Sequence, residues 1–233
     1  MLEVSSINTY YGLSHVLFDV SLEVTEGEVV FLLGRNGVGK TTTMRSIMGL
    51  TPPQSGGITF KGKEIAGVPP YKLAQMGLGY VPEDRRIFAQ LTVQENLEVA
   101  RKQGSKDKEN WTLERVYSLF PALERFKGRQ GGSLSGGEQQ MLTIARTLMG
   151  NPDLLILDEP GEGLAPVVVE QLLGQLKELK QQNLTMLISE QNLWFAGELA
   201  DVVYVIDRGQ TQYRGTAAEF EANQEIKDAY LAV

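Results

Sequence analysis

The chain has 233 residues, of which 42% are hydrophobic and 22% charged, and its formal net charge is −7; this length allows one large domain or a core with a subdomain. It contains no cysteine and a single histidine, His15, which excludes disulfides, thiolate metal sites and multi-histidine metal clusters. The acidic balance argues against a nucleic-acid partner, and no apolar run approaches the ~20 residues of a membrane-spanning helix.

The first third of the chain has the pattern of short strands separated by turn residues. β-Forming residues cluster at 2–4, 16–24 and 58–60. A further apolar run, Val29–Leu33, is followed by a glycine-rich loop and then by a segment compatible with a helix. We expect strands at these positions, with the loop joining a strand to a helix.

This loop, residues 34–41, fits the pattern GxxxxGK[ST]. In the order strand, glycine turn and helix, successive backbone N–H groups and the helix dipole point at one place, which suits a polyphosphate. Lys40 can reach the β- and γ-phosphates, and the Thr41 hydroxyl can hold Mg²⁺. The loop therefore predicts a nucleotide site formed by Gly34, Asn36, Gly37, Val38, Gly39, Lys40, Thr41 and Thr42.

The middle of the chain has no strong strand pattern. Helical patterns cover residues 93–102, 111–120 and 136–149, and the polar stretch 103–109 is typical of an exposed loop. We expect residues 87–151 to form a helical subdomain, inserted into an α/β core of residues 1–86 and 152–233.

Short, nearly continuous apolar runs appear again in the last third, at residues 154–157, 184–188 and 202–206. Such runs are typical of strands buried on both faces of a parallel sheet. Helical segments at 166–181 and 192–199 separate them. The alternation predicts an α/β fold with a mostly parallel sheet.

Two carboxylates, Asp158 and Glu159, directly follow the first of these runs. A buried strand would deliver Asp158 to the loop end, where it can join the coordination shell of Mg²⁺. Glu159 can then face the γ-phosphate and polarise an attacking water. The alternative is an acidic strand end that faces solvent, and the glycine loop makes it the weaker interpretation.

A third motif, LSGGEQQ at residues 134–140, precedes a helical segment. Ser135, Gly136 and Gly137 place a hydroxyl and a helix N-terminus where a phosphate can dock. With these three motifs in this order, the chain resembles the nucleotide-binding subunit of an ATP-binding cassette (ABC) transporter over essentially its whole length.

The resemblance implies a P-loop nucleotide-hydrolase fold, with an antiparallel N-terminal β subdomain beside the mostly parallel core sheet. It also implies a single ABC ATPase domain over residues 1–233, with ATP and Mg²⁺ as cofactors and head-to-tail pairing of two subunits. Residues 37–42 of one subunit and the LSGGE residues of the other, Ser135 to Glu138, would then hold one ATP. Glu159 would be the general base, and Tyr11 would stack on adenine unless it is simply a strand-end tyrosine.

Three positions depart from the general pattern of the family. Glu83 stands where many members carry a glutamine, Gln191 where most carry a histidine, and the loop 161–166 lacks the usual ending. Unlike histidine, Gln191 can donate a hydrogen bond to phosphate but cannot become cationic. Glu83 could serve Mg²⁺ as a ligand or through water. Because of both departures, we expect ATP hydrolysis to be slower, or more dependent on the partner, than in members with the general pattern.

One branch of the family shares these departures, namely the second ATPase subunit of branched-chain amino-acid importers and their urea and short-amide relatives. The segments that carry this similarity are 81–88, 95–97, 163–166, 190–192 and 215–231. The similarity implies an ATPase that powers import from the cytoplasmic face of the membrane and is soluble when isolated. A urea or amide cargo, a soluble ATP switch and a weakly hydrolysing regulatory module remain alternatives.

The branch also implies partners. We expect a heterodimer with a second ATPase subunit in the cell, while the isolated chain could form a homodimer. Residues 85–97 are the candidate surface for docking a transmembrane permease, unless they form an ordinary solvated loop. A substrate-binding protein would be an indirect partner.

Overall fold

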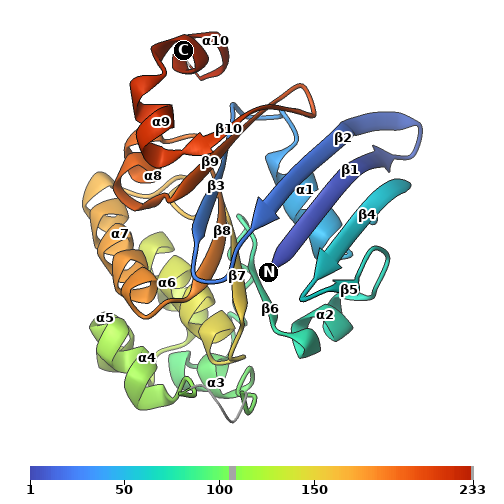
Figure 1. Cartoon of the computed structure of the whole chain (residues 1–233). Helices are drawn as coiled ribbons and strands as arrows, with labels where there is room; N and C mark the ends of the chain where they lie inside the picture. Colours follow the sequence, from blue (N-terminus) through green and yellow to red (C-terminus); the bar gives the residue numbers. More distant parts are fainter. Residues whose placement is uncertain (105–108, 232–233) are drawn as a thin grey trace.

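The computed structural model describes residues 1–104 and 109–231, which form two sheets with helices between and beside them (Figure 1). The smaller sheet is antiparallel and has the strand order β2-β1-β4-β5. Its strands are β1 (Leu2–Tyr11), β2 (Ser14–Val24), β4 (Ser55–Phe60) and β5 (Lys63–Glu64). Buried and exposed side chains alternate along much of β2, as expected where one face of a sheet is covered.

The larger sheet has the order β10-β9-β3-β8-β7-β6, and all neighbouring pairs are parallel except β10 with β9. Its strands are β3 (Val29–Leu33), β6 (Leu78–Val81), β7 (Leu154–Asp158), β8 (Thr185–Glu190), β9 (Val202–Asp207) and β10 (Gln210–Thr216). The mostly parallel α/β sheet predicted from the sequence is therefore confirmed.

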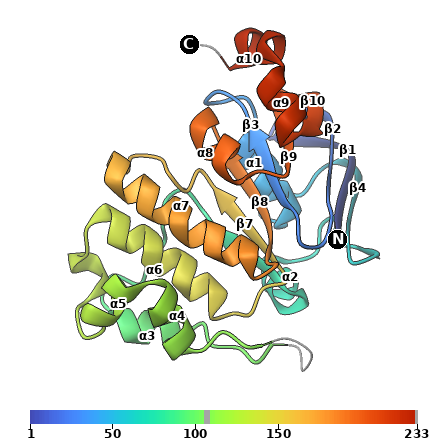
Figure 2. The same cartoon turned by 60° about the vertical axis from the view of Figure 1, so that its left-hand side comes forward.

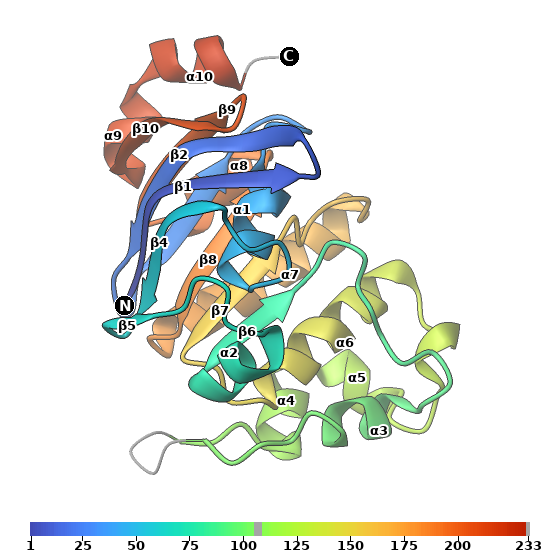
Figure 3. The same cartoon turned by 90° about the vertical axis from the view of Figure 1, so that its right-hand side faces the viewer.

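The apolar runs are continuous because both faces of the larger sheet are covered. In β3, Val29, Phe31 and Leu33 belong to one hydrophobic core, whereas Val30 and Leu32 belong to the other. The second core lies between the sheets, where α1 (Lys40–Ile47) contacts strands of both (Figure 3). On the opposite face, α6 (Gly136–Leu148) and α7 (Pro166–Gln181) run side by side (Figure 2).

Within residues 87–104 and 109–151, helices and turns replace regular strands, as the sequence predicts. Besides α6, these are α3 (Val93–Glu98), α4 (Leu113–Leu119), α5 (Pro121–Arg125) and a 3₁₀ turn (Gly131–Ser133). The helix predicted over 93–102 is shorter than expected. It ends at Glu98, because the chain then turns so that the backbone N–H of Lys102 bonds to Met149 (3.1 Å). The loop expected at 103–109 lies largely outside the described residues.

The remaining helices are α2 (Pro70–Met76), α8 (Leu193–Leu199), α9 (Ala217–Ala222) and α10 (Gln224–Tyr230). The last two form the C-terminal end of the described chain: α9 lies beside β9 and β10, and α10 is at the top of Figure 1. No helix in the described part of the chain has both the length and the apolar character to span a bilayer.

Candidate functional site

The glycine-rich loop connects the end of β3 to the start of α1, as expected. Its conformation depends on glycine at two points. Gly39 precedes α1 with φ of 117°, a backbone region that other residues rarely adopt. At Gly34, a Cβ would lie only 2.5 Å from the carbonyl oxygen of Ile206, so no side chain fits. The loop can therefore present its backbone at the head of α1.

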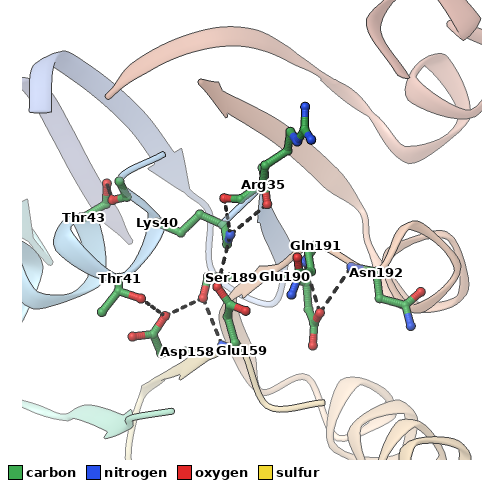
Figure 4. Close-up of polar contacts among 12 residues, drawn as sticks. Arg35, Lys40, Thr41, Thr43, Asp158, Glu159, Ser189, Glu190, Gln191 and Asn192 are labelled. Atoms are coloured by element: carbon green, nitrogen blue, oxygen red, sulfur yellow. Dashed lines mark hydrogen bonds and ion pairs between the residues drawn. The ribbon is translucent and has the colours of Figure 1, made fainter. Parts of the chain in front are cut away.

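The ammonium group of Lys40 lies inside this loop and is almost fully buried. Its Nζ donates to the carbonyl oxygens of Gly34 (2.7 Å) and Arg35 (2.8 Å). It also lies 3.1 Å from Oε1 of Glu159, so the two residues form a buried ion pair (Figure 4). The structure thus brings together two residues that lie far apart in the sequence.

Asp158, the last residue of β7, is fully buried and accepts three side-chain hydrogen bonds. Oδ1 accepts from Thr41 (3.1 Å) and from Ser189 (2.6 Å), and Oδ2 accepts from the Tyr80 hydroxyl (3.1 Å). Burial raises the pKa of Asp158, and the hydrogen bonds from Ser189, Tyr80 and Thr41 oppose that rise. The predicted pair Thr41 and Asp158 is therefore in direct contact.

Glu159 follows with φ of 46°, in the left-handed region that is uncommon for residues other than glycine. Its N–H donates to both the carbonyl oxygen (3.1 Å) and the hydroxyl (3.0 Å) of Ser189, which fixes this turn. One carboxylate oxygen, Oε2, is buried without a hydrogen-bond partner among the described residues.

Two further carboxyl groups lie close to Glu159. Contact with Glu159 and partial burial raise the pKa of Glu162 to about 7. The pKa of Glu83 is raised by partial burial and by the charges of Glu159 and Asp158. Several carboxylates thus surround one ammonium, an arrangement whose excess negative charge a divalent cation can offset.

Gln191 lies just beyond β8 and is exposed. It lines a hollow together with Gly34, Arg35, Asn36 and Leu231, so the structure places it beside the glycine loop. The other predicted loop residues differ in their setting. Asn36 and Gly37 are exposed, Val38 is half-buried, and Thr42 is buried in α1.

The residues of the LSGGE motif form the start of α6. Ser135 is the N-cap, with Glu138 N–H bonded to its hydroxyl (3.4 Å) and its own N–H bonded to Glu138 Oε2 (2.7 Å). Gly136 and Gly137 stand where a Cβ would press on Arg85 and on Val168, respectively. Among the described residues, no recorded hydrogen bond or ion pair links this motif to Lys40. The motif's glycines instead lie against Arg85 and Val168.

Tyr11 ends β1 and is 45% exposed, so its ring is accessible to a ligand. The neighbouring Tyr10 instead stacks on His15, with ring centroids 4.1 Å apart. Nε2 of His15 lies 3.1 Å from Oδ1 of Asn8. His15 thus belongs to the antiparallel sheet, in β2.

The structure adds three polar residues to the site that the sequence patterns do not predict: Tyr80, Ser189 and Glu190. Tyr80 and Ser189 donate hydrogen bonds to Asp158. The carboxylate of Glu190 accepts hydrogen bonds from backbone N–H groups of the loop that follows β7 and the loop that follows β8. All three lie at or near the carboxyl ends of apolar runs. In a parallel sheet these ends share one edge, which is where ligands bind in α/β folds.

A glycine loop at the carboxyl edge of a parallel sheet, with a lysine and two strand-end carboxylates converging on it, defines a P-loop nucleotide hydrolase. Comparison with known proteins makes the class more specific. A family model described as "ABC transporter" matches residues 17–162. The chain belongs to the ABC transporter family.

Several curated relatives are similar over nearly the full length. The high-affinity branched-chain amino acid transport ATP-binding protein BraG of Pseudomonas aeruginosa is 40% identical, covering 99% of both chains. The probable branched-chain amino acid transport ATP-binding protein LivF of Archaeoglobus fulgidus is 34% identical, covering 100% of this chain and 99% of the relative. The lipopolysaccharide export system ATP-binding protein LptB of Escherichia coli K12 is 33% identical, covering 93% and 90%.

A solved structure of the ADP conformation of MJ1267, an ATP-binding cassette of an ABC transporter, superposes with a TM-score of 0.81. It is 27% identical and covers 98% of this chain and 97% of its own. The ABC ATPase fold implied by the three sequence motifs is therefore confirmed.

Proposed function

We propose that the chain is the ATP-hydrolysing subunit of an importer for branched-chain or other hydrophobic amino acids. The observation that carries the hydrolytic part is the set of contacts joining Lys40 to Glu159 and Thr41 to Asp158. The amino-acid part is supported by what the names of the BraG and LivF relatives state. A urea or amide cargo on the same branch is the alternative.

The proposed cofactors are ATP and Mg²⁺. Within the described residues no cluster of three or more histidine, aspartate or glutamate side chains is arranged to hold a metal by itself. This suits Mg²⁺, which binds through one or two carboxylates and completes its shell with water and phosphate oxygens. Thr41 and Asp158 supply a hydroxyl and a carboxylate oxygen at one point, and Glu83 is the proposed third group. When bound, Mg²⁺ would neutralise charge on the phosphates.

The protein groups have separable proposed roles. Lys40 compensates phosphate charge, and the glycine loop from Gly34 to Thr42 supplies N–H donors at the head of α1. Glu159, once released from Lys40, accepts the proton of the attacking water as general base. Gln191 donates a hydrogen bond to the γ-phosphate, and Tyr11 stacks on the adenine ring.

The glycines of the LSGGE motif lie against Arg85 and Val168, and the recorded contacts of Lys40 are with Gly34, Arg35 and Glu159 instead. We propose that Ser135, Gly136, Gly137 and Glu138 contact the γ-phosphate held by a partner. That partner would be a second ATPase subunit in the cell and another copy of this chain in isolation. Residues 1–86 and 152–233 would form the nucleotide-binding core and residues 87–151 the moving helical part.

The segment 85–97 is the proposed docking surface for a permease at the cytoplasmic face of the membrane. It is held firmly on α6: Arg146 donates to the carbonyl oxygen of Arg86 (2.6 Å), and the guanidinium of Arg146 lies 4.8 Å from the Phe88 ring centre. Buried Asn96 bonds to both the N–H and the carbonyl oxygen of Phe88 (2.9 Å each). The exposed ring of Phe88 can contact a partner. Because the backbone of Phe88 is held by hydrogen bonds, force can pass between the partner and this chain without bending the loop.

Glu159→Gln tests this proposal. ATP binding and Mg²⁺-dependent hydrolysis are measured for the parent, for Glu159→Gln, and for Glu198→Gln as a control on the exposed face of α8. We expect Glu159→Gln to keep ATP binding and to lose at least about 100-fold in kcat, the usual size of a general-base contribution. Normal hydrolysis by Glu159→Gln would disprove the assigned base, and ATP binding without hydrolysis by the parent would favour a regulatory module.

A further inference from the structure

Glu190, the last residue of β8, is a carboxylate with only 3% of its surface exposed and with no role in the proposed hydrolysis so far. Burying an ionised carboxylate costs free energy unless its charge is well compensated. Its recorded side-chain partners are three backbone N–H groups rather than a lysine or arginine. A group that is costly to bury and is nevertheless fully hydrogen-bonded needs an explanation.

The three donors come from two different loops. Oε1 accepts from the N–H of Gly161 (3.1 Å), in the loop that follows Glu159. Oε2 accepts from the N–H groups of Gln191 (3.1 Å) and Asn192 (3.3 Å), in the loop that follows β8 (Figure 4). The side chain of Glu190 thus joins the loop after the proposed base to the loop that carries Gln191.

The backbone of Glu190 extends this connection to the glycine loop, because its carbonyl oxygen accepts from the N–H of Gly34 (3.3 Å). Because Gly161 has no side chain, it leaves room for its own hydrogen bond to Oε1 of Glu190. A Cβ at Gly161 would lie 3.0 Å from Oε1 of Glu190, closer than such contacts normally come. All three loops around the proposed γ-phosphate position therefore meet at one residue.

Only a carboxylate can make this connection. An ionised carboxylate has two acceptor oxygens, whereas an amide of the same shape has one oxygen and two competing donors. Burial raises the pKa of Glu190 above its ordinary value, and the hydrogen bonds from Gly161, Asn192 and Gln191 limit that rise by stabilising the carboxylate.

We propose that Glu190 is a positioning residue that holds the loop after Glu159 and the loop of Gln191 in one fixed arrangement, so that both side chains meet the γ-phosphate together. This inference rests on the proposed ATPase function. It predicts that weakening either side of the Glu190 connection slows the chemical step more than it weakens ATP binding.

Two variants approach the connection from opposite sides. Glu190→Gln keeps the shape and removes one acceptor, and Gly161→Ala pushes Oε1 away without changing the carboxylate. Thr185→Val is the matched control, because Thr185 is also buried on β8 and its hydroxyl accepts from a loop N–H, that of Gly27 (2.9 Å). It therefore loses a similar hydrogen bond at the opposite end of the strand.

The first measurement is backbone hydrogen exchange of the full chain without nucleotide. In Glu190→Gln and Gly161→Ala we expect peptides covering residues 159–165 and 190–195 to exchange at least about tenfold faster, because their closing bonds are lost. Those peptides should be unchanged in Thr185→Val. Unchanged exchange in both site variants would overturn the inference whatever the enzyme activity.

The second measurement is steady-state ATP hydrolysis. We expect Glu190→Gln to lower kcat about 10- to 100-fold, the effect of a displaced reacting group, and to leave KM for ATP within about twofold. Thr185→Val should keep the parental kcat. A Glu190→Gln variant with parental kcat would overturn the inference, whereas a parent without hydrolysis would contradict the proposed function itself.

A double-mutant cycle with Gln191→Ala adds a readout that a general loss of stability would not produce. If Glu190 acts by placing Gln191, the double variant should be little slower than the slower single variant. Losses in kcat that simply multiply would show that the two residues act independently and would overturn the proposed connection.

Discussion

Replacing Ser189 by alanine should reveal how strongly the buried site depends on one hydroxyl. The hydroxyl donates to the fully buried carboxylate of Asp158 at 2.6 Å and accepts from the N–H of Glu159 at 3.0 Å. A hydrogen bond to a charged group contributes about 1.5–3 kcal/mol. The N–H of Glu159 loses less, since it retains the carbonyl oxygen of Ser189 at 3.1 Å. We therefore expect Ser189→Ala to lower the free energy of unfolding by about 2 kcal/mol, which corresponds to a fall in Tm of roughly 4–8 °C for a chain of this size.

The size of this loss should depend on pH. The pKa of Asp158 in the folded chain is raised by burial, and the bond from Ser189 limits the rise. A folded acid with a raised pKa binds protons more readily than the unfolded chain, so its stability falls as pH rises through that range. Ser189→Ala raises the folded pKa further. The deficit should consequently be largest near about pH 8 and shrink toward about pH 4, where Asp158 is increasingly protonated in both states.

Urea unfolding at both pH values, without nucleotide or Mg²⁺, measures this difference. Ser46→Ala is the control, because the Ser46 hydroxyl lies 2.9 Å from that of Thr9 in a buried contact between neutral groups. Its loss should be about 1 kcal/mol and independent of pH. If Ser189→Ala behaved like Ser46→Ala at both pH values, the proposed interaction with a charged Asp158 would be wrong.

Two further predictions concern neighbouring charges and tight backbone contacts. In carboxyl-resolved NMR titrations, Glu159→Gln should move the pKa of Glu162 from about 7 toward its ordinary range, because Glu159 is the main cause of the rise; a pKa that stays near 7 would contradict this. Gly209→Ala should destabilise the chain by more than about 2 kcal/mol, since a left-handed φ of 74° adds about 1–2 kcal/mol to a clash with the carbonyl oxygen of Val16. Gly12 also has a left-handed φ, 60°, but open space around it, so Gly12→Ala should lower the free energy of unfolding only by the backbone strain of about 1–2 kcal/mol. Equal free energies of unfolding for the two variants would refute the role of the clash.

Much of the fold follows from local sequence patterns. Helix α7 spans residues 166–181 as predicted, because a proline in its first turn and regularly spaced apolar residues define both its start and its buried face. The continuous apolar runs at β3 and β7 mark strands covered on both sides. By contrast, β10, α9 and α10 were not predicted, since most of their residues are at least partly exposed and leave little hydrophobic periodicity.

The candidate site likewise contains residues that the sequence predicts and residues that it does not. Lys40, Thr41, Asp158 and Glu159 could be predicted to converge, because the carboxyl ends of parallel strands share an edge. Ser189 could not, because its contacts require β8 to pair with β7, and strand order is a tertiary property that local patterns do not record. The left-handed turn at Glu159 is likewise imposed by its neighbours rather than by its own preference.

The ion pair between Lys40 and Glu159 has a consequence for the chain before nucleotide arrives. In the proposed site Glu159 would compete with the phosphate as a tethered anion, since its carboxylate lies 3.1 Å from the ammonium that we propose binds the phosphate. A tethered group has a high effective concentration, so it lowers the apparent affinity for the incoming ligand in proportion to the time it occupies the lysine. Phosphate entry and the release of the carboxylate are then one exchange. Before nucleotide binds, Lys40 thus neutralises Glu159, the proposed base. The same ion pair lowers the affinity of the chain for the nucleotide.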